Sequence, residues 1–334
     1  MKEMFLPPEG QYRYFRSKLS GAEAEAYDAL LGCFLAHGRS VDISAEAGSK
    51  LSELLMYICS DVPEVFFVRR LHSSTDLLSR KCRVFPEYRF DRKECTDLFL
   101  CMEEKAGEIS KGLIGVKGTA EKILYIHDCL VRSVTYRDPE APYSHEAAGA
   151  LIYGIAVCEG ISKAFKFVSD RICPGINAAV VFGTAKTGCG AAENHAWNIV
   201  TVGRNSFHID CTFDNTLSSG GEVRYDYFLL SDRQIGSDHF FSGLPECSRD
   251  NEFYQYLGCC ADTEEELRSI IGRLSAASPL TVKLRDSSCD EDETDRIAKL
   301  AAECYVSRSG RSAEIRVSGN SCRSVYRIEV REYG

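Results

Sequence analysis

The sequence has no long apolar run and no long run of lysine and arginine. No stretch approaches the ~18 apolar residues that a membrane-spanning helix needs, so the sequence predicts no membrane span. The net charge of -9 and the missing basic run argue against nucleic acid and anionic membrane surfaces as partners. The N-terminus also lacks a basic start followed by an apolar stretch, the pattern of a secretory signal. We therefore expect a cytoplasmic protein if the chain is full length, and an extracellular or cell-envelope protein if it is a mature fragment.

The sequence also has no CxxC pair, although it contains 16 cysteines. The usual spacing of a zinc site is therefore absent. Disulfide frameworks are expected mainly in short secreted chains, whereas this chain has 334 residues. We predict that most of the thiols are small buried hydrophobic side chains, with disulfides as the alternative. A catalytic role for any single cysteine must therefore follow from its local context.

The apolar patterns predict an α+β chain in three parts, at 1–115, 116–240 and 241–334. In the first part, Ser20 and Glu23 form the pattern of a capping box, which predicts a helix over 20–36. Further helices are expected at 46–59 and 91–110, and strands at 64–68 and near 76–88. In the second part, Thr119 is expected to cap a helix, and a polar loop follows at 137–146.

The third part shows its own helix and strand signals. Thr263 and Glu266 form a second capping-box pattern ahead of an apolar helical repeat. A strand is expected at 281–284, a helix with acidic first turns at 290–305, and a terminal hairpin around Gly319 and Asn320. The acidic run is read as a solvated helix start in preference to a metal site.

Cys158 stands at the first turn of a predicted helix. Apolar residues recur at helical spacing over 157–168, so one face of this segment is apolar. A helix N-terminus presents unpaired N–H groups and positive partial charge, which stabilise the thiolate form of a cysteine. Taken alone, this context also fits a structural thiol at a helix start.

His195 and Asp210 share one face of a predicted hairpin over 194–214, with a turn at 203–206. This face also carries Trp197, whereas the opposite face is apolar except for Asn198. A histidine base that is oriented by a carboxylate suits a thiol nucleophile. A simple pairing of residue 202 with residue 207 places Asp210 opposite residue 199, so a bulge or a tighter turn is needed to bring the two side chains level. A solvent-facing polar side of an ordinary hairpin is the alternative.

Other polar side chains could take part in such a site. His208 and Asp214 lie on the same predicted face, and His145 precedes Cys158 by 13 residues. For His145 and His208 we favour structural or surface roles. A zinc ion bound by Cys158, His195, His208 and Asp210 is a further alternative, although we expect no metal and no cofactor.

The order Cys158, His195, Asp210 resembles the transglutaminase-like superfamily. The residues that carry the likeness are GIAVCEGISKAF (154–165), NHAWNIV (194–200), FHIDCTFD (207–214) and RYDYFLLSD (224–232), within a region of about 119–235. The resemblance implies a papain-like core, in which the helix bearing the cysteine packs on an antiparallel sheet. The N-terminal and C-terminal α+β regions would then be accessory parts of a bacterial member.

The resemblance also implies residue roles. Cys158 would attack an amide or ester carbonyl, His195 would transfer the proton, and Asp210 would orient His195. Trp197 would line the substrate cleft, with packing alone as the alternative. The backbone N–H of Cys158 would donate to the oxyanion.

The expected function is acyl transfer on a peptide or protein substrate. Hydrolysis and transamidation share one thioacyl intermediate, and we lean towards hydrolysis. The alternative is a non-catalytic binding module that keeps the fold. The sequence leaves the oligomeric state open. We expect Cys158→Ala to keep the fold, and Asp210→Asn to lower the rate with little effect on folding.

Overall fold

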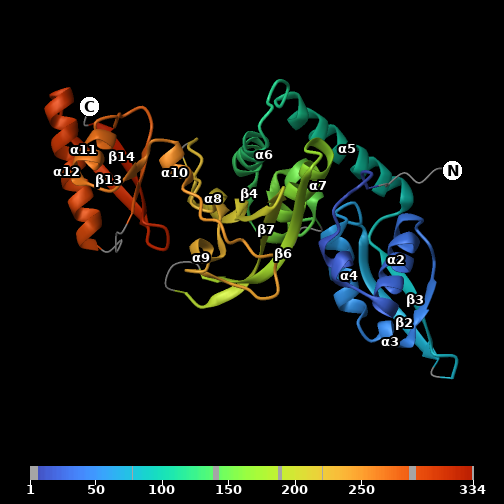
Figure 1. The fold of residues 1–334 in the computed structure, drawn as a ribbon. Coiled ribbons are helices and arrows are strands. Elements are labelled where there is room, and N and C mark those ends of the chain that lie inside the picture. Colours follow the sequence, from blue (N-terminus) through green and yellow to red (C-terminus); the bar gives the residue numbers. More distant parts are fainter. Residues whose placement is uncertain are drawn as a thin grey trace.

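The computed structural model describes residues 7–76, 78–137, 143–186, 190–219, 221–285 and 291–332. Helices and strands are mixed along the chain, so the fold is α+β as expected. Three groups of elements follow one another along an elongated molecule (Figure 1). Among the described residues, no helix is both long enough and apolar enough to cross a membrane.

The first group packs helices against an antiparallel sheet of order β1-β3-β2. Its elements are α1 (Tyr14–Lys18), α2 (Gly21–Leu35), β1 (Val41–Ser44), α3 (Ala45–Gly48), α4 (Leu51–Asp61), β2 (Val68–Asp76), β3 (Lys81–Tyr88) and α5 (Arg92–Lys111).

Three local predictions in this group are wrong. Ser20 does precede α2, but its side chain makes no capping hydrogen bond. The helix expected over 46–59 is broken between α3 and α4. Residues 64–67, three of them apolar, lie in a loop with turns, and the strand begins only at Val68. They are nevertheless fully buried, which shows that a short apolar run marks burial without specifying a strand.

The middle group contains a five-stranded sheet of order β10-β6-β7-β8-β9, in which all neighbours are antiparallel. Its elements are α6 (Thr119–Ser133), β4 (Thr135–Tyr136), the π-helix η1 (Gly149–Tyr153), β5 (Ile155–Ala156), α7 (Cys158–Ile172), β6 (Ile176–Lys186), β7 (Ala192–Val202), β8 (Asn205–Ile209), α8 (Cys211–Leu217), β9 (Phe228–Leu230), α9 (Asp232–Ile235) and β10 (His239–Phe240). Thr119 is the first residue of α6 and Gly118 is its cap, so the expected side-chain cap does not form. Part of the polar loop predicted at 137–146 lies outside the described residues.

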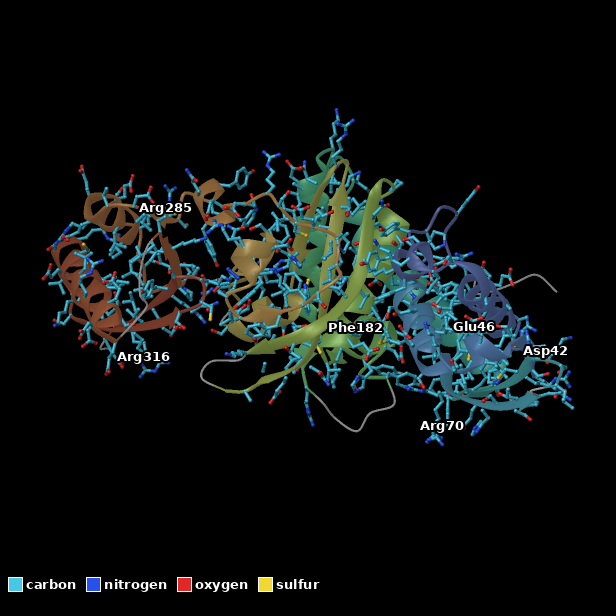
Figure 2. All side chains as sticks on the ribbon, turned by 60° about the horizontal axis from the view of Figure 1, so that its bottom comes forward. Asp42, Glu46, Arg70, Phe182, Arg285 and Arg316 are labelled. Atoms are coloured by element: carbon cyan, nitrogen blue, oxygen red, sulfur yellow. The ribbon has the colours of Figure 1, made fainter. Side chains whose placement is uncertain are left out.

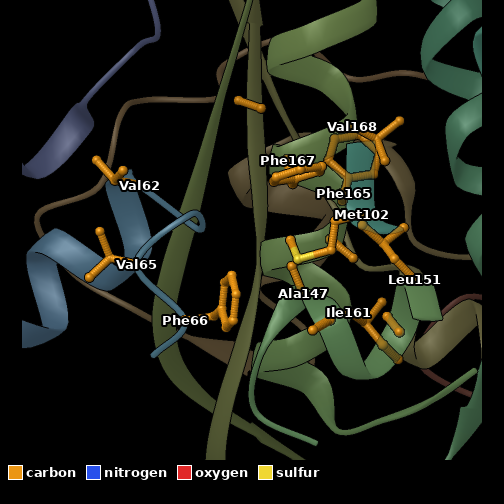
Figure 3. Close-up of a cluster of buried hydrophobic side chains, with 14 of the residues drawn as sticks. Val62, Val65, Phe66, Met102, Ala147, Leu151, Ile161, Phe165, Phe167 and Val168 are labelled. Carbon is orange, nitrogen blue, oxygen red and sulfur yellow. The ribbon is translucent and has the colours of Figure 1, made fainter. Parts of the chain in front are cut away.

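Helix α7 lies at the centre of the main core. It packs against β6 and β7 on one side and against α5, α6 and η1 on others. Figure 3 shows Ile161, Phe165 and Val168 of α7 beside Met102 of α5 and Leu151 of η1, all of them buried. The same apolar cluster continues into the first group, where it includes the buried turn residues 65–67. The position of α7 is therefore fixed by apolar packing on several sides.

The third group forms a separate apolar cluster under a four-stranded sheet of order β11-β12-β14-β13. Its elements are β11 (Cys260–Ala261), α11 (Glu264–Ile271), β12 (Leu280–Leu284), α12 (Glu291–Ser309), β13 (Ala313–Asn320) and β14 (Val325–Glu332), whereas the preceding α10 (Phe253–Tyr256) packs through Phe253 on the main cluster. Figure 2 shows Arg285 and Arg316 of this group at one end of the molecule, Asp42 and Arg70 at the other, and Phe182 of β6 between them.

The predictions for this third part are mostly confirmed. Thr263 and Glu266 form the predicted capping box at the start of α11. Strand β12, helix α12 and the terminal hairpin occupy the expected places, although Gly319 and Asn320 pair within β13 ahead of the turn. The division of the chain at 115 and 240 stays a prediction.

The cysteines of the described residues are all free thiols, so no disulfide links any two of them. Cys82, Cys95, Cys173, Cys211 and Cys247 are buried, Cys101 is exposed, and the others are partly buried.

Candidate active site

Cys158 is the first residue of α7, with Val157 as the N-cap, so its predicted place at a helix start is confirmed. Its side chain is partly buried. The segment before η1 packs directly against this first turn, because a Cβ at Gly160 would lie 2.3 Å from the carbonyl oxygen of Ser144. The same oxygen accepts a hydrogen bond of 3.0 Å from the backbone N–H of Val157. The start of α7 is thus held in place by a neighbouring backbone.

A buried lysine strengthens this anchorage. The Nζ of Lys163, one turn after the start of α7, lies 2.9 Å from Glu146 Oε2, 2.9 Å from Glu159 Oε1 and 3.1 Å from the backbone oxygen of His145. Lys163 is only 2% exposed. Burial opposes its charge, but the two carboxylates outweigh burial and raise the pKa of Lys163. The cluster ties the segment before η1 to the helix that carries Cys158.

We expect Lys163→Met to lower the free energy of unfolding by about 3 kcal/mol, because it leaves the buried carboxylate of Glu146 with only the more distant Arg89, at 3.9 Å, as a cationic partner. Urea unfolding measures this loss. Lys105→Met is the matched control, since Lys105 pairs with Glu108 on the surface and should change stability little. An equal, small effect of both variants would contradict the anchoring role of Lys163.

The hairpin of β7 and β8 has a tighter turn than the simple pairing predicts. Val202 pairs with Asn205, so only Gly203 and Arg204 form the loop, and Gly203 has a φ of 63°. Glycine adopts this left-handed conformation without strain, as a two-residue hairpin turn requires. The register moves by two residues relative to the 202-to-207 pairing, which brings Asp210 nearer to His195 while each side chain keeps its predicted face.

Asn198 of β7 explains how the hairpin is fixed against α7. Asn198 is the one polar residue on the face of the hairpin that the sequence predicts to be apolar. Its Nδ2 donates to the backbone oxygens of Ser162 and Ala179 at 3.0 and 3.2 Å. Ser162 Oγ lies 3.2 Å from the backbone oxygen of Ala196 and 2.8 Å from that of Cys158. These bonds join the first turns of α7 to the strand residues beside His195.

Asp210 does not lie on a strand, so this prediction is wrong. Strand β8 ends at Ile209, and Asp210 is the N-cap of α8. Its Oδ1 accepts backbone N–H bonds from Thr212 and Phe213 at 2.9 and 3.1 Å. An aspartate that satisfies two amides in this way ends the strand and starts a helix. The cap also fixes the orientation of the carboxylate, and Oδ2, which takes no part in the cap, can accept hydrogen bonds from other side chains.

His195 connects the carboxylate to the thiol. Its Nε2 lies 2.7 Å from Oδ2 of Asp210, and Cys158 is close enough to its ring to interact electrostatically. Because Asp210 occupies Nε2, the contact with the thiol falls to Nδ1. Burial disfavours the charged ring, but the charge and hydrogen bond of Asp210 outweigh burial and, with Cys158, raise the pKa of His195 to about 10. The pKa of Asp210 is held well below its usual value, although burial opposes its ionisation, by His195 and by a second histidine, His239.

Trp197 lies behind this group and is 0% exposed. Its ring is stacked at 5.9 Å from that of His195, and its Nε1–H donates to Nδ1 of His208 at 2.9 Å. Gly183 leaves room for the ring, because a Cβ there would approach it to 2.7 Å. In this structure Trp197 therefore packs in the interior, which is the alternative to the expected lining of a cleft.

His239 is the member of the group that sequence reasoning missed. Its Nε2 lies 3.0 Å from Oδ2 of Asp210, and its Nδ1 lies 2.6 Å from Oδ1 of the neighbouring Asp238. Strand β10 has only two residues and pairs with β6. The sequence shows no periodic signal for so short a strand, and an Asp-His pair alone is weak.

The remaining candidates have other partners. His145 has a 55% exposed side chain, and its Nδ1 lies 3.3 Å from Glu159. Asp214 is buried, and its Oδ2 lies 3.1 Å from Nε2 of His127. His208 lies between Trp197 and Asp232, whose Oδ1 is 2.7 Å from Nε2. None of these contacts involves Cys158 or His195.

Two groups of described residues bring three possible metal ligands together: His195, Asp210 and His239, and His208, Asp232 and Cys247. In the second group, the indole N–H of Trp197 can only donate, so it requires a lone pair on Nδ1 of His208. Nε2 then carries the proton and has no lone pair for a metal. In the first group, hydrogen bonds of 2.7 and 3.0 Å account for the spacing. Neither group is assigned to a metal ion.

No protein-family model and no curated protein matches the sequence. Two of the solved structures that match are a candidate cysteine protease from Cytophaga hutchinsonii and a protein described as a TGase, each 12% identical to this chain. The first match covers 43% of this chain and 61% of that chain, with a TM-score of 0.29. The second covers 59% of this chain and 60% of that chain, with a TM-score of 0.32. This chain thus spans about three fifths of the length of each.

Proposed function

We propose that the protein is a cysteine-dependent acyl-transfer enzyme that acts on peptide or protein amides. Cys158 is the nucleophile, His195 the base and acid, and Asp210 the group that orients His195. The observation that carries the proposal is the side chain of His195, which pairs at 2.7 Å with the capped carboxylate of Asp210 and interacts with Cys158 at the start of α7. We also propose that α7 and the five-stranded sheet form a transglutaminase-like core of papain type.

The proposed chemistry follows from the atoms on either side of His195. The sulfur of Cys158 attacks the carbonyl carbon of an amide, and the thiol proton resides on the imidazole. His195 then gives this proton to the leaving amine as the C–N bond breaks, which leaves a thioester on the sulfur. Water or an amine attacks the thioester, the C–S bond breaks, and the proton returns through His195 to the sulfur. The backbone N–H of Cys158, at the start of α7, is a donor for the oxyanion.

The rival function is a binding module that keeps the fold without catalysis. Such a module needs no thiol beside an imidazole that pairs with a buried carboxylate. A buried ion pair costs desolvation energy, so it is expected only where stability or chemistry repays that cost. This consideration favours the enzyme, and hydrolysis over transamidation remains the preferred outcome.

The test incubates the wild type and Cys158→Ala with a peptide mixture, with and without an added primary amine, and reads the products by mass spectrometry. We expect cleaved or deamidated peptides from the wild type, amine adducts if the acceptor is an amine, and neither product from the variant. Peptide binding without conversion, equal in both proteins, would favour the binding module.

A further inference from the structure

His239 is placed between two carboxylates, and the described residues give each of its ring nitrogens one acidic partner. Nε2 lies 3.0 Å from Oδ2 of Asp210, and Nδ1 lies 2.6 Å from Oδ1 of Asp238. The residue is only 2% exposed. It is therefore shielded from solvent and held at both nitrogens.

The surrounding donors show where the protons lie. Tyr227 donates its hydroxyl proton to Oδ2 of Asp238 at 2.5 Å, as expected if Asp238 is an ionised acceptor. Asp210 already accepts bonds from two backbone amides and from His195. Both nitrogens of His239 must then donate, which requires the imidazolium form. Burial opposes this charge, but the two carboxylates outweigh it and raise the pKa of His239.

We propose that His239 is a positioning residue for the pair of His195 and Asp210. It is a buried imidazolium held by Asp238, and it fixes the position of Oδ2 of Asp210. Its positive charge also weakens the attraction of the Asp210 carboxylate for the proton on His195. The inference rests on the proposed function only for its effect on turnover. Its effect on the protonation of His195 follows from geometry alone.

The argument depends on charge at short range. The ring centroids of His195 and His239 are 5.4 Å apart, and both rings face the same oxygen of Asp210. A positive charge at this distance disfavours a second one on His195 by on the order of one to two pKa units, at the effective dielectric constant typical of proteins. Without it, the carboxylate of Asp210 would act on His195 alone, and His195 would hold its proton to higher pH.

Other titratable and charged groups surround this arrangement from several elements. His208 of β8 is close enough to His239 to interact electrostatically, and burial lowers the pKa of His208, so it is neutral near pH 7. Arg323 and Cys322, in the turn between β13 and β14, interact with Asp238. The groups that face His239 or its partner Asp238 are thus Asp210, His195, Tyr227, His208, Arg323 and Cys322.

The test compares Cys158→Ala with the double variant Cys158→Ala and His239→Gln. Glutamine keeps a donor towards Asp210 and removes the charge. The alanine background removes the thiol, one of the groups that raise the pKa of His195, so that the midpoint reports on Asp210 and His239. With labelled histidine, NMR follows His195 among the seven histidines of the chain, of which the double variant keeps all but His239. We expect the His195 midpoint to rise by about one unit in the double variant.

The matched control is His208→Gln in the same background. This substitution also replaces a buried histidine next to Trp197, but it removes no charge and no contact with Asp210. A purely structural role for His239 predicts an unchanged or lower midpoint, equal in both variants, and this result would overturn the proposal. If the double variant does not fold, the ¹⁵N shifts of His239 in the wild-type protein decide: two protonated ring nitrogens at pH 8 support the proposal, and one overturns it.

Turnover separates this inference from the proposed function. In the otherwise wild-type protein, we expect His239→Gln to lower kcat about tenfold with little change in KM. A raised His195 midpoint in a protein without any turnover would refute the proposed enzyme but keep the proton argument. Turnover with an unmoved midpoint would refute the role of His239 and keep the enzyme.

Discussion

Replacing Cys158 by alanine is expected to lower turnover by on the order of 10⁵–10⁶-fold while the protein stays folded. The sulfur is the only atom of the proposed site that bonds to substrate, and no other group can take its place. The side chain is partly buried at the first turn of α7, and α7 is fixed by its own apolar face and by Lys163. Turnover and thermal unfolding, measured on the same preparation, test both halves of this expectation.

Two other cysteines supply controls. Cys211 follows Asp210 and is buried, and burial raises the pKa of its thiol well above the usual value. Cys211→Ala should therefore cost stability, about 1 kcal/mol, with little effect on turnover. Cys101 is exposed, so its alkylation by iodoacetamide, followed by mass spectrometry, gives the rate of an ordinary thiol. A Cys158 that reacts no faster than Cys101 near neutral pH would contradict the nucleophile.

The helix that carries Cys158 could be predicted because its signal is local. Apolar residues at helical spacing mark one face over 157–168, and the structure buries that face in the main core. The capping box at Thr263 and Glu266 is similarly local and is confirmed, whereas the same pattern at Ser20 and Glu23 is not. Glu23 pairs instead with Lys50 of a neighbouring segment, so a tertiary contact took precedence over the local motif.

The relation of His195 to Asp210 could be predicted only in part. The alternation of side chains along the strands predicts that both lie on one face of the hairpin. The observed register differs from the simple pairing by two residues, an even number, so this part of the prediction is unchanged. The register itself depended on whether Gly203 takes a positive φ, which the sequence permits but does not require. The end of β8 depended on the side chain of Asp210 capping α8. The position of His239 beside Asp210 depends on how the two-residue strand β10 pairs with β6, and a strand this short has no periodic sequence pattern that would predict the pairing.

Asp210→Asn is expected to lower turnover by about 10³–10⁴-fold. The amide must present its nitrogen either to the two histidines or to the backbone of α8. In the first orientation it meets the N–H of His195, so His195 must move its proton to Nδ1, the nitrogen that should receive the thiol proton. In the second it meets the N–H groups of Thr212 and Phe213, and the cap is lost. Both orientations remove the negative charge that raises the pKa of His195 to about 10, so that pKa falls towards 6.5.

The same geometry changes the expectation for stability. The sequence predicts little effect on folding, but Asp210 is completely buried and accepts four hydrogen bonds, so we now expect a loss of about 1–3 kcal/mol.

The pH dependence of this loss follows from the two pKa shifts. The raised pKa of His195 contributes stability that is complete below pH 6.5 and is lost as the pH rises through about 10. The lowered pKa of Asp210 contributes stability that is complete above pH 3.8 and is lost in stronger acid. The difference in unfolding free energy between wild type and Asp210→Asn should therefore be greatest between pH 3.8 and 6.5 and should shrink towards pH 10. Asp232→Asn is the control, because it alters a hydrogen-bonded aspartate–histidine pair, with a neutral His208, outside the proposed site. Equal turnover of wild type and Asp210→Asn, with a stability difference that does not vary with pH, would mean that the ion pair of His195 and Asp210 serves neither catalysis nor folding.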